Sequence, residues 1–239
     1  MLHSNRPMLV KLALRSLFIS MKAQSKKPVA TKLGSHQIRL IGGQWKRTPL
    51  NVISADGLRP TPDRVRETVF NWINHLIDGR WESLRCLDLF AGSGALGFEA
   101  ASRGATQVTM VECHTPAFRQ LQLVKEKVGA DQIELLRADA LTLVASMVAR
   151  QQRFDLIFLD PPFNQGMLQK ILPYCSKLLS ESGLLYLEAE QAVVTNDAHG
   201  VPAGDGFNLS QDWRVIRADK AGSVYFHILQ RNILEHDGT

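Results

Sequence analysis

Short apolar runs alternate along the middle of the chain with stretches in which apolar residues recur at helical spacing. The apolar runs cover residues 84–90, 107–112, 132–139, 154–160 and 183–189. The periodic stretches between them cover about residues 95–103, 115–128, 140–151 and 167–180. Apolar strands separated by helices are typical of a parallel sheet covered on both faces. We therefore predict an α/β domain here.

Strand patterns of a different kind lie at both ends of this domain. Residues 213–231 contain two strand patterns around a turn at residues 220–222, which predicts an antiparallel hairpin on the sheet edge. Residues 38–41 and 50–53 are β-prone and enclose Gly42-Gly43 and a basic stretch, which predicts a small N-terminal hairpin. The polar, glycine-rich segment 191–212 is interpreted as a loop.

A helix is predicted shortly after the N-terminal hairpin. Thr61 is a suitable N-cap and Pro62 a suitable first helical residue. The apolar residues that follow fall on one helical face: Val65, Val69, Trp72, Ile73 and Leu76.

Charge is distributed unevenly over the 239 residues. Ten of the 28 Lys and Arg residues lie in residues 1–55, which contain no acid, so the remainder has more acidic than basic residues. A basic arm on an acidic body favours a polyanionic partner, most simply nucleic acid, although a solvated tail without a ligand has the same composition. We expect a basic, flexible extension at 1–34, a β-hairpin element at 35–58 and the main domain at 59–239.

Several classes of protein are excluded by composition. No apolar run approaches the roughly 18 residues of a membrane span. Three cysteines (Cys86, Cys113 and Cys175) without short spacing argue against a disulfide scaffold or a cysteine-rich zinc site, and they fit a cytoplasmic protein. The histidines show no metal-ligand spacing, so no metal site is predicted.

A glycine-rich turn follows the first strand of the α/β region. Gly92, Gly94 and Gly97 match G-x-G-x-x-G, which lets a ligand approach the main chain at a helix N-terminus. This pattern alone favours a nicotinamide dinucleotide. Asp88, at the end of the strand, would repel a phosphate but attract a cation such as the sulfonium and ammonium groups of S-adenosylmethionine.

Two further acids end the next two strands. Glu112, 18 residues after Gly94, is predicted to accept both ribose hydroxyls, and Asp139 to meet an adenine edge. Each acid alone has the alternative interpretation of a helix cap or a surface charge. The predicted cofactor site comprises Asp88, Phe90, Gly92, Gly94, Glu112, Asp139 and Ala140.

The fourth strand runs directly into Asp160-Pro161-Pro162-Phe163. The two prolines lack N–H donors and stiffen the chain, which holds the flanking side chains and carbonyls in place. Asp160 and the Pro161 carbonyl can each accept one N–H of an exocyclic amine, while the Phe163 ring can stack on the base. We predict that these four residues catalyse methyl transfer to an aromatic amine without a metal.

These motifs together resemble the class I S-adenosylmethionine-dependent methyltransferases that act on amino groups. LIGGQWKRTPLNV and RPTPDRVRETVFNWI, ahead of the glycine loop, resemble more specifically the RsmD-like 16S rRNA (guanine-N2)-methyltransferases. The resemblance covers about residues 38–231. It implies a Rossmann-like, seven-stranded methyltransferase sheet with a C-terminal antiparallel hairpin and a small N-terminal β-hairpin extension.

The resemblance also implies a substrate and roles for matching positions. The target would be a guanine in small-subunit ribosomal RNA, within an assembled or assembling subunit. Asp160, Pro161 and Phe163 match the family's catalytic motif, and Gly92, Gly94 and Glu112 match its cofactor site. A monomer would suffice, because the motifs imply one active site per chain.

The RNA-binding residues are expected beside the glycine loop. The basic hairpin and the first turns of the following helix are positioned to contact phosphates, and Trp45 is expected to pack rather than to stack on a base. The target base would have to leave its stack to reach Asp160. The predicted RNA-binding set is Gln44, Lys46, Arg47, Arg59, Arg64 and Arg66.

Three other functions fit parts of the pattern. An adenine-N6 or cytosine-N4 DNA methyltransferase uses the same catalytic motif, but the chain has no large target-recognition domain. A non-catalytic RNA-binding protein on the same fold would not need the complete Asp160-Pro161-Pro162-Phe163 motif. A nicotinamide-dependent oxidoreductase would bind a dinucleotide in place of S-adenosylmethionine.

Overall fold

The computed structural model describes residues 37–52, 62–163, 165–195 and 206–232, all within one compact unit, residues 35–239. The predicted extension 1–34 and the candidate RNA-binding residue Arg59 lie outside these residues, as does the predicted N-cap Thr61. No helix in the described ranges is long and apolar enough to cross a membrane.

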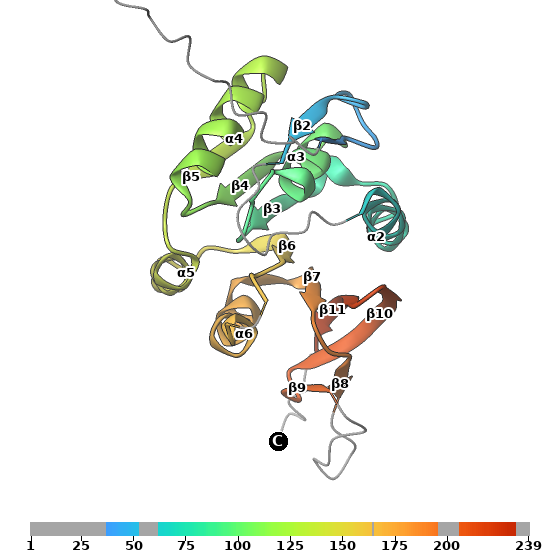
Figure 1. Ribbon diagram of the computed structural model, residues 1–239. Helices are drawn as coiled ribbons and strands as arrows, with labels where there is room; N and C mark the ends of the chain where they lie inside the picture. Colours follow the sequence, from blue (N-terminus) through green and yellow to red (C-terminus); the bar gives the residue numbers. More distant parts are fainter. Residues whose placement is uncertain (1–36, 53–61, 164, 196–205, 233–239) are drawn as a thin grey trace, which may run out of the picture. The chain divides into compact units, whose positions relative to one another are not determined.

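A seven-stranded sheet forms the centre of the unit (Figure 1). Its strands are β3 (Arg85–Asp88), β4 (Gln107–Val111), β5 (Ile133–Leu136), β6 (Phe154–Leu159), β7 (Leu179–Ala189), β10 (Trp213–Ala221) and β11 (Val224–Arg231). The strand order is β10-β11-β7-β6-β3-β4-β5, in which β7 to β5 are parallel and β10 and β11 form the antiparallel edge. The predicted fold class, a methyltransferase-type sheet with a C-terminal hairpin, is confirmed.

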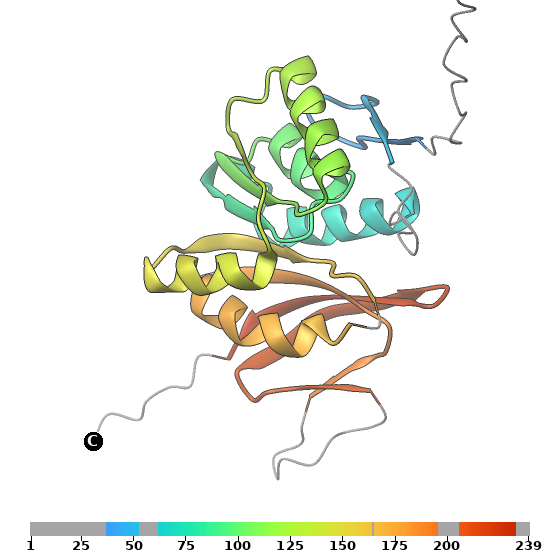
Figure 2. The same ribbon diagram turned by 60° about the vertical axis from the view of Figure 1, so that its left-hand side comes forward.

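Helices cover both faces of this sheet (Figure 2). One face packs against α2 (Asp63–Leu76), α3 (Ala95–Ser102) and α4 (Thr115–Val128), and the other packs against α5 (Ala140–Ala149) and α6 (Met167–Leu178). The strands contribute alternate residues to these two cores, as Phe158 and Leu159 of β6 show. Burial on both faces explains why the strands are continuously apolar in sequence.

The N-terminal hairpin is a two-stranded antiparallel sheet of β1 (Gln37–Arg39) and β2 (Pro49–Asn51). Ile38 and Leu50 face each other in register and are buried in the same core as α2 and α3. The loop between the two strands, residues 40–48, therefore starts and ends at anchored positions. The predicted N-terminal hairpin is confirmed.

Two local expectations are corrected. The segment 191–212 was expected to be a loop, but it contains β8 (Val193–Thr195) and β9 (Phe207–Leu209), which pair in parallel. Leu209 is buried, so the few apolar residues of this polar segment are used for packing. In addition, α2 begins at Asp63, and Pro62 occupies the N-cap rather than the first helical position.

Candidate active site

The carboxyl ends of β3 and β6 bring the glycine loop and the proline motif together. The two strands are parallel neighbours whose register pairs Asp88 with Phe158. Asp160 follows two residues after Phe158, so both predicted motifs leave the sheet side by side at one edge. Open α/β sheets bind ligands at this edge.

The glycine loop leads from β3 into α3 along a path that requires glycine. Gly94 caps α3 with φ at +82°, and a Cβ there would lie 2.5 Å from Cδ2 of Phe98. A Cβ at Gly97 would lie 2.8 Å from Cγ of Met110 on β4. The two glycines therefore serve the turn and the close packing of helix on strand, two of the roles of glycine in nucleotide-binding turns.

Asp88 is buried beneath this loop, and its side chain is 2% exposed. Its Oδ2 accepts the N–H of Gly97 at 3.0 Å, a first-turn amide that has no partner within the helix. Burial raises the pKa of the Asp88 carboxyl to about 7, against the effect of the hydrogen bonds from Gly97 and Phe90, and the charge of Glu112 raises it further. A cationic ligand would favour the ionised form, so this buried acid fits the predicted cofactor.

Glu112 ties the end of β4 to the glycine loop. Its Oε2 accepts the N–H of Gly92 at 2.8 Å, and its Oε1 accepts the N–H of His114 at 2.6 Å. The side chain is half-buried. Each oxygen retains lone-pair capacity for a further donor, so the contact with ribose hydroxyls stays a prediction with a compatible geometry.

Asp139 has the geometry of a helix cap. Its Oδ1 accepts both the N–H and the hydroxyl of Thr142 at 2.8 Å at the start of α5. The bonds from Thr142 lower the pKa of this exposed carboxyl, so the side chain is ionised at neutral pH. Phe90 is half-buried against the α5 and α6 core, and Ala140 is the buried first residue of α5. Their contacts with a cofactor stay predictions.

The proline motif emerges from the buried strand β6. Asp160 is half-buried, Pro161 is buried and Pro162 is half-buried. The Phe163 side chain is 37% exposed, one of two large apolar side chains exposed in the described ranges. Together with Pro161 and Pro162, it lines a pocket of about 170 Å³ that continues along the start of α6 and the end of β7. An exposed ring at a pocket is suited to stacking.

A side chain that the sequence analysis missed completes this part of the edge. Glu188, near the end of β7, is 3% exposed and is among the residues that line the same pocket. The hydroxyl of Tyr186 donates to its Oε1 at 2.7 Å. The rule that selected Asp88, Glu112, Asp139 and Asp160, an acid at the end of a strand, also applies to Glu188.

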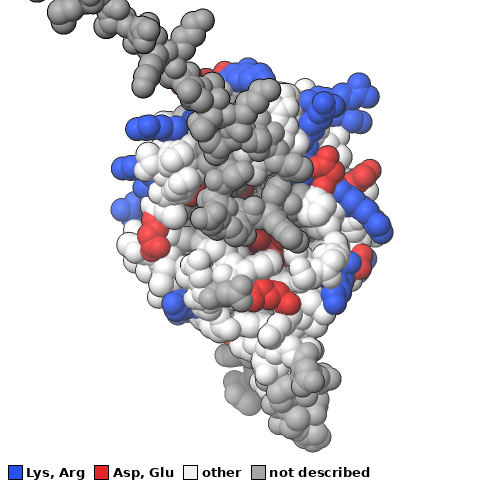
Figure 3. Space-filling view, in the orientation of Figure 1, with Lys and Arg blue, Asp and Glu red and all other residues white. Residues whose placement is uncertain are grey.

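The predicted RNA-binding residues of the hairpin lie on the loop 40–48. Gln44, Lys46 and Arg47 are exposed, and Lys and Arg side chains gather over this hairpin at the upper right of Figure 3. Trp45 is half-buried against the core, as expected for a packing residue. Arg64 is exposed on the first turn of α2. RNA binding by these residues stays a prediction.

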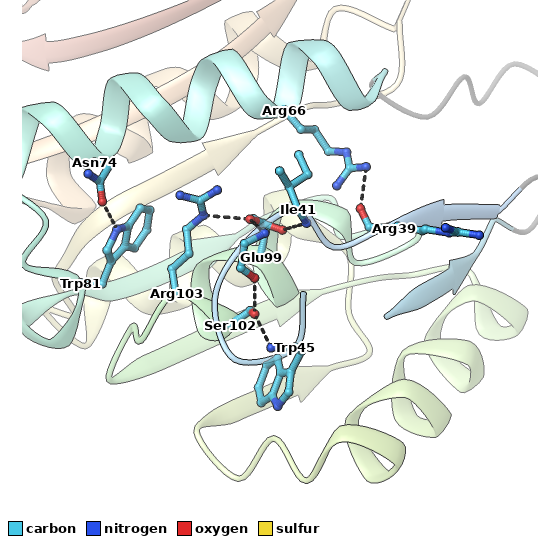
Figure 4. Close-up of polar contacts among 10 residues, drawn as sticks. Arg39, Ile41, Trp45, Arg66, Asn74, Trp81, Glu99, Ser102 and Arg103 are labelled. Atoms are coloured by element: carbon cyan, nitrogen blue, oxygen red, sulfur yellow. Dashed lines mark hydrogen bonds and ion pairs between the residues drawn. The ribbon is translucent and has the colours of Figure 1, made fainter. Parts of the chain in front are cut away.

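The loop 40–48 is fastened to α3 by buried polar contacts (Figure 4). Glu99, which is fully buried, accepts the N–H of Ile41 at 2.7 Å and that of Gly42 at 2.8 Å. The Ser102 hydroxyl accepts the Trp45 N–H at 2.9 Å and donates to the Gly42 carbonyl at 2.7 Å. The basic loop is thereby attached to the helix that begins at the glycine loop.

The expectation that Arg66 contacts RNA is corrected. Its side chain is fully buried, and its guanidinium donates to the Arg39 carbonyl at 3.0 Å (Figure 4). It also donates to Asp63 at 2.6 Å. A guanidinium without exposed surface does not reach a phosphate, so Arg66 joins α2 to the hairpin.

Within the described ranges, no group of three or more His, Cys, Asp or Glu side chains is arranged to hold a metal ion.

Comparison with known proteins places the sequence within one family. Residues 38–230 match the family model described as "Conserved hypothetical protein 95". The Ribosomal RNA small subunit methyltransferase D of Escherichia coli (strain K12) is 37% identical over 200 residues, which are 83% of this chain and 92% of that protein.

Solved structures agree with this match. The structure of yhhF from Escherichia coli, described as a candidate methyltransferase, has a TM-score of 0.65 at 32% identity and covers 82% of this chain and 98% of its own. SMU.776, a candidate methyltransferase complexed with SAH, has a TM-score of 0.55 at 19% identity and covers 76% of this chain and 53% of its own. At that identity the second structure shows the fold alone.

Proposed function

The chain belongs to the family described as "Conserved hypothetical protein 95", and from that premise we propose that it transfers a methyl group from S-adenosylmethionine to the exocyclic N2 amine of a guanine in small-subunit ribosomal RNA. The register of β3 and β6 carries the proposal. It pairs Asp88, below the glycine loop, with Phe158, two residues before the proline motif. A bound cofactor and a target amine would therefore meet at this sheet edge.

The cofactor half of the site is built to hold a cation next to the main chain. When bound, S-adenosylmethionine supplies a methyl group on a positively charged sulfur. The buried Asp88 carboxyl offsets that charge, and Gly92 and Gly94 let the ligand approach the backbone. Glu112 has lone pairs for the ribose hydroxyls. The adenine contacts of Phe90, Asp139 and Ala140 complete the proposed set.

The acceptor half of the site positions an amine that is a poor nucleophile. Asp160 and the Pro161 carbonyl each accept one N–H of the guanine N2, which frees its lone pair for attack. Pro162 holds this geometry, and the Phe163 ring stacks on the base, a contact worth about 1–3 kcal/mol. Asp160 also takes up the proton that N2 loses. Distance and orientation, rather than a covalent intermediate, provide the rate enhancement.

The RNA is held by exposed basic residues of the hairpin and of α2. Lys46 and Arg47, with Gln44, contact the backbone from the loop 40–48, and Arg64 contacts it from α2. Arg59, outside the described residues, belongs to the same proposed set. The substrate is ribosomal RNA within an assembled or assembling small subunit, which provides shape for recognition.

We further propose that the protein acts as a monomer in the cytoplasm, away from membranes, because one chain carries one site. The proposed parts of the chain are a basic extension at 1–34, a hairpin element at 35–58 and a methyltransferase domain at 59–239.

Methyl transfer from labelled S-adenosylmethionine tests the proposal. The acceptors are deproteinised ribosomal RNA, small subunits that lack the modification, and duplex DNA, followed by nucleoside analysis. We expect label as N2-methylguanosine in the ribosomal samples, with subunits favoured over bare RNA. Label as N6-methyladenine or N4-methylcytosine in DNA would replace the proposal with a DNA methyltransferase. Cofactor binding without label in any acceptor would contradict the proposed substrate.

A further inference from the structure

Glu188 lies on the strand next to the one that leads into the proline motif. Strands β6 and β7 are parallel neighbours, and their register pairs Phe158 with Tyr186 and Leu159 with Leu187. Asp160 is the first residue after β6, and Glu188 is the next residue of β7. Because side chains alternate across a strand, Glu188 projects to the same face as the Tyr186 ring, which lies edge to face with the Phe158 ring at 6.1 Å. The charges of both Asp160 and Glu188 act on the Tyr186 hydroxyl, which puts the two acids in the same neighbourhood at adjacent strand ends.

The surroundings of Glu188 hold its carboxylate as a hydrogen-bond acceptor. Tyr186 is fully buried, and its hydroxyl lies 2.7 Å from Oε1 of Glu188. Burial raises the pKa of the Tyr186 hydroxyl well above its ordinary value, and the charges of Glu188 and Asp160 raise it further. The hydroxyl therefore keeps its proton and donates it. A carboxylate offers about four acceptor sites, so accepting one hydrogen bond is compatible with accepting another from a ligand.

Glu188 lines the pocket in which the target base is proposed to bind. Glu188 lines it together with Pro161, Pro162 and Phe163, the residues proposed to hold and stack the target base. A base-modifying enzyme reads a flipped base by its Watson–Crick edge. A nearly buried carboxylate that lines this pocket is placed to take part in that reading.

We propose that Glu188 selects guanine by accepting its N1–H while Asp160 accepts an N–H of the adjacent N2 amine. Guanine presents donors at both positions, which match two carboxylates at adjacent strand ends. Adenine and cytosine present a ring nitrogen lone pair next to their amine, and this lone pair would face the Glu188 carboxylate without a proton between them. Such a mismatch sets an acceptor against an acceptor in a nearly buried site, which a hydrogen-bonding site rejects strongly. The inference rests on the proposed function, because it assigns the base specificity of that site.

The first test uses the wild-type protein and three substrates. The methylated guanine is mapped, and the RNA is then reassembled with 2-aminopurine or 6-thioguanine at that position. 2-Aminopurine keeps the C2 amine but lacks N1–H, whereas 6-thioguanine keeps N1–H and alters only the O6 position. We expect methylation of 2-aminopurine to be slower by on the order of 100-fold, with 6-thioguanine close to guanine. Equal rates on guanine and 2-aminopurine would overturn the assignment without any variant.

The second test uses Glu188→Gln, with Glu181→Gln as a control at the exposed start of the same strand. A glutamine amide can donate to the ring nitrogen of 2-aminopurine, so the preference for guanine should fall to about tenfold or less in Glu188→Gln. The control should keep the wild-type preference, and both variants should keep the wild-type affinity for S-adenosylmethionine. An unchanged preference in folded Glu188→Gln would refute the role of Glu188.

Tyr186→Phe provides a variant that keeps the carboxylate. Removal of the hydroxyl leaves Glu188 less well oriented, so we expect kcat on guanine to fall by about tenfold and the guanine preference to narrow, with the melting temperature measured alongside. Wild-type rates and preference in this variant would show that the hydroxyl does not orient the base-reading group. A wild-type protein that methylates no guanine would instead refute the proposed function, so the two failures are distinguishable.

Discussion

The two halves of the sheet edge differ in what surrounds their acids. At the ends of β3 and β4 and at the start of α5, Asp88, Glu112 and Asp139 each accept a backbone N–H. At the ends of β6 and β7, the Tyr186 hydroxyl donates to Glu188, and the two residues after Asp160 are prolines, which lack N–H groups. The acids of the cofactor half thus hold their own loops, while the Tyr186–Glu188 contact joins two side chains of one strand.

This difference predicts how substitutions act. A change in the cofactor half should alter folding or cofactor affinity, because the same groups hold the loops. A change in the acceptor half should alter the chemical step and leave cofactor affinity in place.

Asp160→Ala should have the largest effect of these substitutions, and that effect should be limited to the chemical step. Removal of the group that accepts the amine proton should lower kcat by on the order of 1000-fold, a loss typical of removing one preorganised polar group. Steady-state kinetics and calorimetric titration with S-adenosylmethionine measure the two quantities. Asp131→Ala, at an exposed acid after α4, serves as the control. A matching loss of cofactor affinity would remove the distinction between the two halves.

Gly94→Ala should destabilise the folded protein at the glycine loop of the cofactor half. The new methyl group meets Phe98 at 2.5 Å in a backbone with φ at +82°, so unfolding free energy should fall by about 2–3 kcal/mol. Gly129→Ala measures the cost of a positive φ alone, because Gly129 has φ at +63° and no atom lies within 4 Å of the added Cβ. Its cost should be about 1 kcal/mol. Urea unfolding compares the two, and equal losses would show that the contact with Phe98 relaxes freely.

The pH dependence of cofactor affinity should report Asp88. Its pKa near 7 means that the carboxyl of the ligand-free protein gains charge as the pH rises through neutrality. The cationic cofactor binds the ionised form, so affinity should increase about tenfold from about pH 6 to pH 8 and level off above. Asp88→Asn should bind more weakly and lose this part of the dependence. The same slope in the variant would assign the titration to the ligand or to another group.

Lys46→Ala should have the smallest effect of these substitutions and should leave both cofactor affinity and the chemical step unchanged. Loss of one phosphate contact should reduce the slope of log affinity for RNA against log salt by about 1, with kcat at saturating RNA unchanged. Lys177→Ala, an exposed lysine at the end of α6, is the matched control. Filter binding over a salt series measures both slopes. An unaltered slope in Lys46→Ala would remove the hairpin loop from the RNA interface.

The helices between residues 84 and 189 were predictable from their helical spacing and the strands from the apolar runs between them. The hairpins at both ends were predictable as well, but the roles of single side chains there were not, because these depend on how the elements pack. Arg66 shows this most clearly: helical spacing places it on the face of Val69 and Phe70, but its burial depends on the Arg39 carbonyl and Asp63. Strands β8 and β9 are three residues each and lie in a polar, glycine-rich segment, which favoured a loop in the sequence analysis.

The site was predictable in its location but not in its bonding. Acids at strand ends predicted a common edge, and the structure places Asp88 and Asp160 at the ends of neighbouring strands. That Glu112 would hold the Gly92 amide depends on the conformation of a loop, which no sequence pattern specified. Glu188 was overlooked, although it satisfies the same strand-end rule.

Helix α3 connects the basic loop to the cofactor half of the site. Glu99 and Ser102 hold the loop 40–48 on the second half of the helix, and Gly94 caps its start. Eight residues at helical rise span about 12 Å. If the basic loop binds a phosphate as proposed, this short helix would keep that phosphate and the cofactor at a fixed separation. Lengthening α3 by one turn would change that separation.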